Sequence, residues 1–203
     1  LAREGMQKGK GRMDELRAFL AERARESGDR PGYLELQLAE TISGLSLEKY
    51  KAFRELCTAE EWSAYEPRLL AALENARDME RLEIHMHRSE HDRAIAILSA
   101  MRFPDSRSWS PALLQIAAQL EDKYPEQILT FYRSGLGNLN RNDQRKGYAA
   151  RAAVARLVRH VWVDVLRTPE QWESFARKVK AANRGRPAFQ EEFARVVPGW
   201  DAL

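Results

Sequence analysis

The stretch that begins at Ser89 constrains this chain most, because it is a succession of segments with apolar residues at helical spacing. The segments read HDRAIAILSAM, SPALLQIAAQLEDKY, PEQILTFYRSGL and DQRKGYAARAAVARLVRHVWVDVL, with little between them. Apolar residues at positions i, i+3, i+4 and i+7 line one face of a helix. Alternating apolar and polar runs between hairpin turns, the pattern of strands, are absent. The sequence therefore predicts an all-α fold.

A weak internal repeat runs through these segments. The apolar block Ala94–Leu98 recurs at Ile128–Tyr132, 34 residues later, and Ala117 recurs at Ala152, 35 residues later. Helix pairs of about 34 residues are the tetratricopeptide period. One such pair cannot bury its apolar face alone, so neighbouring pairs stack. We expect antiparallel helix pairs stacked as a tetratricopeptide-like α-solenoid; an irregular helical bundle is the alternative.

We expect a flexible N-terminal segment, residues 1–12, followed by a single helical-repeat domain, residues 13–203. Apolar periodicity and turn residues place its helices at about 13–27, 33–43, 46–57, 59–75, 79–86, 93–101, from 111, from 125, 143–166, from 169 and 189–196. Pro31 and Gly32 are assigned to a turn. Thr58 and Glu61 have the spacing of a capping box. Pro67 falls inside a helical pattern, where proline costs about 3 kcal/mol, so we expect a kink or a helix restart.

Charge is distributed unevenly along the chain. Residues 1–101 hold 16 Lys and Arg against 19 Asp and Glu, a balance of −3. Residues 102–203 hold 17 against 11, a balance of +6, which divides the predicted domain into an acidic half, 13–101, and a basic half, 102–203. Within 141–186 the count is 12 basic to 4 acidic residues, or +8. A local excess of this kind is typical of a docking face for an acidic molecule.

The candidate partner-binding residues lie in this basic stretch: Arg145, Arg156, Arg159, Lys178, Arg184 and Arg186. At about 100° per residue, the first two arginines point within about 20° of each other, and Arg159 points about 40° to the other side of Arg145. We expect all three to be exposed, opposite an apolar stripe of valines: Val154, Val158, Val161 and Val165. The alternative interpretation is that these residues form a solvated surface whose charges pair with those of the acidic half.

No constellation for catalysis or metal binding emerges from the sequence. His85, His87 and His91 are close in sequence, but only the last two are spaced i, i+4, and we assign them to a solvated corner between helices. Cys57, the single cysteine, has no neighbouring histidine and aspartate, so we expect a buried or semi-buried structural thiol. Trp109 and Trp200 fall in predicted loops, where packing is expected and an exposed anchor is the alternative. The expectation is a non-enzyme with no cofactor and no metal.

The sequence favours a cytoplasmic protein. No apolar run approaches the roughly 20 residues that span a bilayer, so we expect no membrane association. The first residues carry charges without the apolar centre of a signal peptide, and a single cysteine fits a reducing compartment. The chain begins with Leu1 rather than Met, as a fragment of a longer protein does.

The second half resembles a known family. The resemblance is carried by the block Ala94–Leu98, by LLQIAAQLEDKYPEQILTFY, by GYAARAAVARLVRH and by EQWESFARKVKAANRGRPAFQEEF. This order is similar to the helical C-terminal region of bacterial SWIM zinc-finger proteins and related helical-repeat domains, over roughly residues 48–197. The zinc module needs Cys-x-Cys and Cys-x-His, which a chain with only Cys57 lacks. The resemblance implies a scaffold region without the metal-binding part.

The function that the sequence favours is a non-catalytic scaffold for protein–protein interaction, because stacked helices present concave faces to partner segments. The alternative is a nucleic-acid-associated module that uses the basic stretch 141–186.

Overall fold

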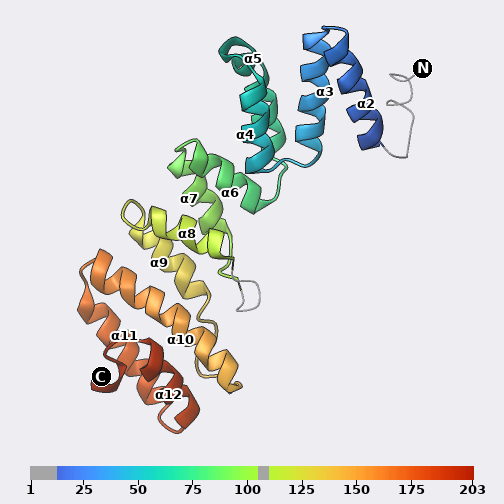
Figure 1. Cartoon of the computed structure of the whole chain (residues 1–203). Helices are drawn as coiled ribbons and strands as arrows, with labels where there is room; N and C mark the ends of the chain where they lie inside the picture. Colours follow the sequence, from blue (N-terminus) through green and yellow to red (C-terminus); the bar gives the residue numbers. More distant parts are fainter. Residues whose placement is uncertain (1–12, 105–109) are drawn as a thin grey trace. The chain divides into compact units, whose positions relative to one another are not determined.

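The computed structural model describes residues 13–104 and 110–203, and it is built from helices (Figure 1). Eleven α-helices, one π-helical turn and one 3₁₀ turn cover 76% of the described residues, among which no strand occurs. The all-α prediction is confirmed at this level. The predicted flexible segment 1–12 and Trp109 lie outside the described residues.

The chain forms two compact units, which meet in sequence between Ser89 and Glu90. The boundary lies twelve residues before the change from the acidic to the basic half at 101/102. In a stacked array each helix contacts mainly its neighbours, so one continuous array can also divide into two groups of contacts. The single helical-repeat domain therefore stays a prediction.

Five helices make up the described part of the first unit. They are α2 (Met13–Glu26), α3 (Arg30–Ser43), α4 (Leu47–Leu56), α5 (Ala59–Leu73) and α6 (Asp78–His87). Helix α3 packs against α2, α4 and α5, and α4 also packs against α6. Each helix thus contacts its neighbour in sequence or the next helix but one.

Local side-chain bonds set the helix starts. The predicted capping box is present, since Thr58 Oγ1 accepts from the Glu61 N–H and Glu61 accepts from the Thr58 N–H. Helix α3 begins earlier than predicted: Asp29 Oδ1 accepts from the Gly32 N–H at 2.9 Å. The turn assigned to Pro31 and Gly32 is therefore wrong. Proline fits the first helical turn because no intrahelical partner exists there for its missing N–H.

Helix α5 does not restart at Pro67, contrary to one of the two expected outcomes, and runs from Ala59 to Leu73. The proline removes the bond that would reach the carbonyl of Ser63, four residues earlier. Both residues are exposed, so water can satisfy that carbonyl.

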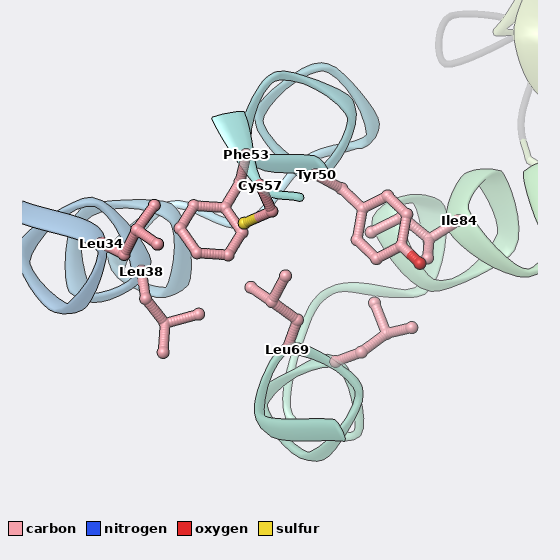
Figure 2. Close-up of a cluster of buried hydrophobic side chains, with 8 residues drawn as sticks. Leu34, Leu38, Tyr50, Phe53, Cys57, Leu69 and Ile84 are labelled. Atoms are coloured by element: carbon pink, nitrogen blue, oxygen red, sulfur yellow. The ribbon is translucent and has the colours of Figure 1, made fainter. Parts of the chain in front are cut away.

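The core of the first unit gathers buried side chains from α3, α4, α5 and α6 (Figure 2). Its members are Leu34, Leu38, Tyr50, Phe53, Cys57, Leu69, Leu73 and Ile84. Edge-to-face ring contacts extend it, with centroids 5.2 Å apart for Tyr50 and Trp62 and 5.9 Å apart for Phe53 and Tyr65. Apolar burial of this kind, worth about 25 cal/mol per Å², is what joins helices that are marginal alone.

The second unit begins with three short helices, α7 (His91–Ala100), α8 (Pro111–Leu120) and α9 (Pro125–Ser134). The long helix α10 (Arg145–His160) follows and passes into the π-helical turn η1 (Val161–Val165). Helices α11 (Pro169–Ala182) and α12 (Pro187–Val196) and the 3₁₀ turn η2 (Trp200–Ala202) complete it. Helix α7 packs against α8 and α9, α8 against α9, α9 against α10, and α10 against α12.

The predicted single helix 143–166 is thus wrong in one respect, because its last turn is π-helical. The Leu166 N–H donates to the Val161 carbonyl at 2.8 Å, five residues back. Trp162, in this turn, packs its ring against Trp172 and Phe175 of α11, with centroids 6.4 and 5.5 Å away. The turn therefore positions the tryptophan that joins α10 to α11.

Candidate partner-binding surface

Helix α10 buries a wider arc than the valine stripe predicted. Val154, Val158 and Val161 are buried as expected, whereas Val165 is half-buried. Tyr148, Ala152 and Ala155 are buried as well. The cause is that α10 packs against two neighbours, α9 and α12, rather than one.

Because of this wider arc, the three arginines of α10 differ in exposure. Arg145 and Arg156 are exposed, as predicted. The Arg159 side chain is only 25% exposed, and its guanidinium lies 3.8 Å from the Asp164 carboxylate. The expected exposure of Arg159 is wrong because the buried arc reaches its side of the helix.

Arg145 is exposed but engaged within the unit. Its guanidinium pairs with Glu191 and, at 3.1 Å, with Glu192 of α12. The hydrogen bond and charge of Glu191 raise the pKa of the arginine. Glu192 is 1% exposed and also pairs with Arg195. These contacts hold α10 to α12, which makes Arg145 a structural residue.

Arg186 is engaged in a similar way. One Nη donates to Asn183 Oδ1 at 2.6 Å, and the other donates to the carbonyl of Asn140. Arg151 fastens the same loop, with bonds to Asp143 Oδ2 at 2.7 Å and to the carbonyl of Asn138 at 3.2 Å. Part of the basic excess of 141–186 therefore secures the loop before α10.

Three of the six candidate residues remain available for a partner: Arg156, Lys178 and Arg184. All three are exposed. Within residues 13–104 and 110–203, no side-chain hydrogen bond or ion pair involves them. Their charges are solvated, so a partner can bind them without breaking an internal contact.

A hollow of about 440 Å³ lies beside the end of α11. It is lined by Arg177, Lys180, Ala181, Arg184, Gln190, Asp201 and Leu203. Lys180 Nζ donates to the carbonyls of Trp200, Asp201 and Leu203 at 2.8, 3.0 and 3.1 Å. These bonds satisfy all three ammonium donors and fix one wall of the hollow.

Gln190 also lines the hollow and makes three side-chain hydrogen bonds. Its Oε1 accepts from the Trp200 indole N–H at 3.0 Å, and its Nε2 donates to the carbonyls of Lys180 and Asn183. Trp200 is 1% exposed, so the expectation of packing for this residue is confirmed. The sequence placed Trp200 in a loop and contained no signal for these long-range bonds.

Sequence reasoning missed a polar network around His160. Its Nε2 lies 3.1 Å from Glu121 Oε2, and its Nδ1 lies 3.0 Å from Asp164 Oδ2. Tyr132 donates to the other Glu121 oxygen at 2.8 Å. Burial and the charge of Glu121 raise the pKa of Tyr132, which keeps its hydroxyl a donor. Glu121 lies 39 residues from His160, and no motif links the two.

The histidines considered as metal ligands and the single cysteine lie in different surroundings. His85 lies within α6 and is 3% exposed, so the solvated-corner interpretation is wrong for it, whereas His87 is the last residue of α6 and is exposed. In the part of the chain that the structure describes, no three His, Cys, Asp or Glu side chains gather where they could hold a metal ion. Cys57 is buried, and burial raises the pKa of its thiol.

Comparisons with protein-family models, with curated proteins and with solved structures gave no match to this chain. The resemblance to SWIM zinc-finger proteins stays a prediction. Over the described residues, every helix is too short or too polar to cross a membrane.

Proposed function

We propose that this chain is a non-catalytic helical-repeat scaffold that binds an acidic protein through the second unit. The observation that carries the proposal is the availability of Arg156, Lys178 and Arg184, which are exposed and make no side-chain hydrogen bond or ion pair with the described residues. Exposed guanidinium and ammonium groups attract carboxylates and pair with them in charge-assisted bonds.

The helix contacts support the repeat part of the proposal. In the second unit α7, α8 and α9 pack pairwise, and α9 continues to α10. The repeated blocks Ala94–Leu98 and Ile128–Tyr132 fall in α7 and α9, and each begins at the fourth residue of its helix. A tetratricopeptide-like array of this kind, located in the cytoplasm and similar to the helical region of SWIM zinc-finger proteins, is the setting we propose.

The experiment compares two probes by fluorescence anisotropy: a labelled peptide rich in glutamate and a labelled duplex DNA of random sequence. The charge-reversed variant R156E/K178E/R184E is matched with R23E/R25E/K51E, which makes the same change of charge on exposed positions of the first unit. We expect the first variant to bind the peptide roughly tenfold more weakly than the control, since three surface ion pairs at about 0.5 kcal/mol each amount to about 1.5 kcal/mol.

Equal peptide binding by the two variants would contradict the proposal. Tighter binding of DNA than of peptide at physiological salt, with affinity falling by a log–log slope near −0.9 per phosphate contact, would instead favour the nucleic-acid-associated alternative.

A further inference from the structure

We propose that His160 forms a proton-dependent link within the second unit. When its ring carries a proton, it bonds the end of α8 to the π-helical turn η1, and when the proton leaves, this link weakens. The inference is independent of the proposed function, because Glu121 and Asp164, the two residues that the ring contacts, are not among the candidate partner-binding residues.

Both nitrogens of the His160 ring face a carboxylate oxygen. Nε2 lies 3.1 Å from Glu121 Oε2, and Nδ1 lies 3.0 Å from Asp164 Oδ2. A neutral imidazole has one N–H donor and one accepting nitrogen, whereas an imidazolium has two donors, and an ionised carboxylate can only accept. In this geometry the charged ring therefore makes two hydrogen bonds. The neutral ring makes one and points a lone pair at the other carboxylate.

Glu121 is the better placed of the two carboxylates to attract the charged ring. Its side chain is 10% exposed, against 46% for Asp164, so water screens its charge less. Its other oxygen accepts from Tyr132 at 2.8 Å, which holds the carboxylate in place. The His160 side chain is 48% exposed, so a proton can reach the ring from solvent.

The nearby arginines leave this attraction in place. Arg159, from α10, lies 3.8 Å from Asp164 and partly neutralises that carboxylate. Arg133, from α9, places its guanidinium over a tryptophan ring, 5.4 Å from the ring centre. Among the described residues, neither arginine forms an ion pair with Glu121. The charge of Glu121 therefore acts on the imidazole.

The other elements of the second unit contribute charges that are bound elsewhere or solvated. Glu191 and Glu192 of α12 pair with Arg145 at the other end of α10. Lys123, which follows α8, pairs with Asp92 of α7. The charged side chains of α11 nearest in sequence to η1 and along the middle of the helix are exposed: Glu170, Glu173, Arg177 and Lys178. The two carboxylates at the ring thus dominate its surroundings.

The link joins two separate places in the fold. Glu121 follows the last residue of α8, and Asp164 lies in η1, the turn that follows α10. Helix α8 packs against α7 and α9, and η1 packs against α9, α10 and α11. The charged ring therefore adds a direct bond between α8 and η1, and the strength of this bond depends on the proton.

The direction of the pH effect follows from this geometry. A histidine without partners, as in the unfolded chain, changes charge near about pH 6.5. The folded chain gains two bonds from the charged ring, so the link contributes its full stability below about pH 6 and loses it as the pH rises above neutral. The link is therefore stronger in mild acid than in mild base.

The test measures urea unfolding of the second unit at about pH 5.5 and about pH 8.5, on either side of the range in which histidine changes charge. H160Q removes the charge and keeps a donor and an acceptor. H87Q is the matched control, because His87 is exposed and belongs to the first unit. A third measurement makes H160Q in an E121Q/D164N background, where both carboxylates are neutral amides.

We expect H160Q to raise the unfolding constant of the second unit about tenfold at the lower pH and less than about threefold at the higher pH, since charge-assisted hydrogen bonds are roughly twice as strong as neutral ones. H87Q has the same effect at both pH values, and so has H160Q in the E121Q/D164N background. Equal effects of H160Q at the two pH values in the otherwise unchanged chain would overturn the inference, as would a pH dependence that survives the loss of both carboxylates.

Hydrogen exchange tests the inference in the unmutated chain, whether or not H160Q folds. The Leu166 N–H donates to the Val161 carbonyl at 2.8 Å and reports on η1. Its protection factor should fall at least about threefold from the lower to the higher pH, relative to that of the Trp62 N–H, which donates to the Thr58 carbonyl in the first unit. An equal change at the two amides would contradict a proton-dependent link at η1.

Discussion

Glu192 offers the sharpest test of how the second unit is held together, because its neighbour Glu191 provides a matched control. Both carboxylates pair with Arg145 across α10 and α12. The Glu192 side chain is 2% exposed and also pairs with Arg195, whereas the Glu191 side chain is 58% exposed. Replacing each with glutamine keeps the shape and removes one negative charge.

The expected cost follows from burial. The glutamine at 192 can accept from one arginine through its oxygen, but its NH₂ group faces the other guanidinium, donor against donor. One charge-assisted bond is lost, worth about 1.5–3 kcal/mol, and a buried amide is left unsatisfied at about 1–3 kcal/mol. Because both arginines are more than half exposed and screened by water, we reduce this sum of about 2.5–6 kcal/mol to about 2–3 kcal/mol. E191Q should cost about 0–1 kcal/mol.

The assay is urea unfolding followed by far-UV circular dichroism, with the transition of the second unit identified from its Trp fluorescence. E192Q should lower the free energy of unfolding by about 2–3 kcal/mol without changing the slope against urea. If E192Q lies within about 0.5 kcal/mol of E191Q, the pairing of a buried carboxylate with Arg145 does not hold α10 to α12, and Arg145 would rejoin the available residues.

Two further predictions concern groups with shifted pKa values. The Arg30 guanidinium lowers the pKa of Glu61 from 4.5 to about 2, so this contact contributes stability that is present above about pH 4.5 and is lost as the pH falls through about 2. E61Q should be less stable than wild type at pH 7, and this difference should be clearly smaller at pH 2, as urea midpoints at both pH values will show. Tyr132 donates to Glu121 from a buried position, so Y132F should lower the free energy of unfolding by about 2 kcal/mol, and a thermal midpoint equal to that of wild type would show that water replaces the hydroxyl.

Local signals in the sequence were sufficient for most helix starts. Thr58 and Glu61 are three residues apart, so their mutual bonds depend on no distant contact. In two helices, α3 and α5, the prediction from the sequence fails at a proline. The chain enters α3 at Asp29 because that side chain caps it, and α5 continues through Pro67 because the affected carbonyl faces water.

The candidate surface was only partly predictable, because helical spacing gives the direction of a side chain but not its neighbours. The wheel placed Arg145 and Arg156 together, and both are exposed. It could not show that Glu191 and Glu192 come from α12 to bind only the first of them. The bonds from Lys180 to carbonyls 20 to 23 residues away are likewise a product of tertiary packing.

The cations of the second unit, as we interpret them, divide into those that hold it together and those that bind an acidic partner. The most direct measurement of this division is backbone NMR of the chain titrated with the glutamate-rich peptide. We predict chemical-shift changes around Arg156, Lys178 and Arg184, with little change in the first unit. Changes confined to the first unit, or centred on Arg145 and Arg186 with none at the three available residues, would contradict this division of the cations.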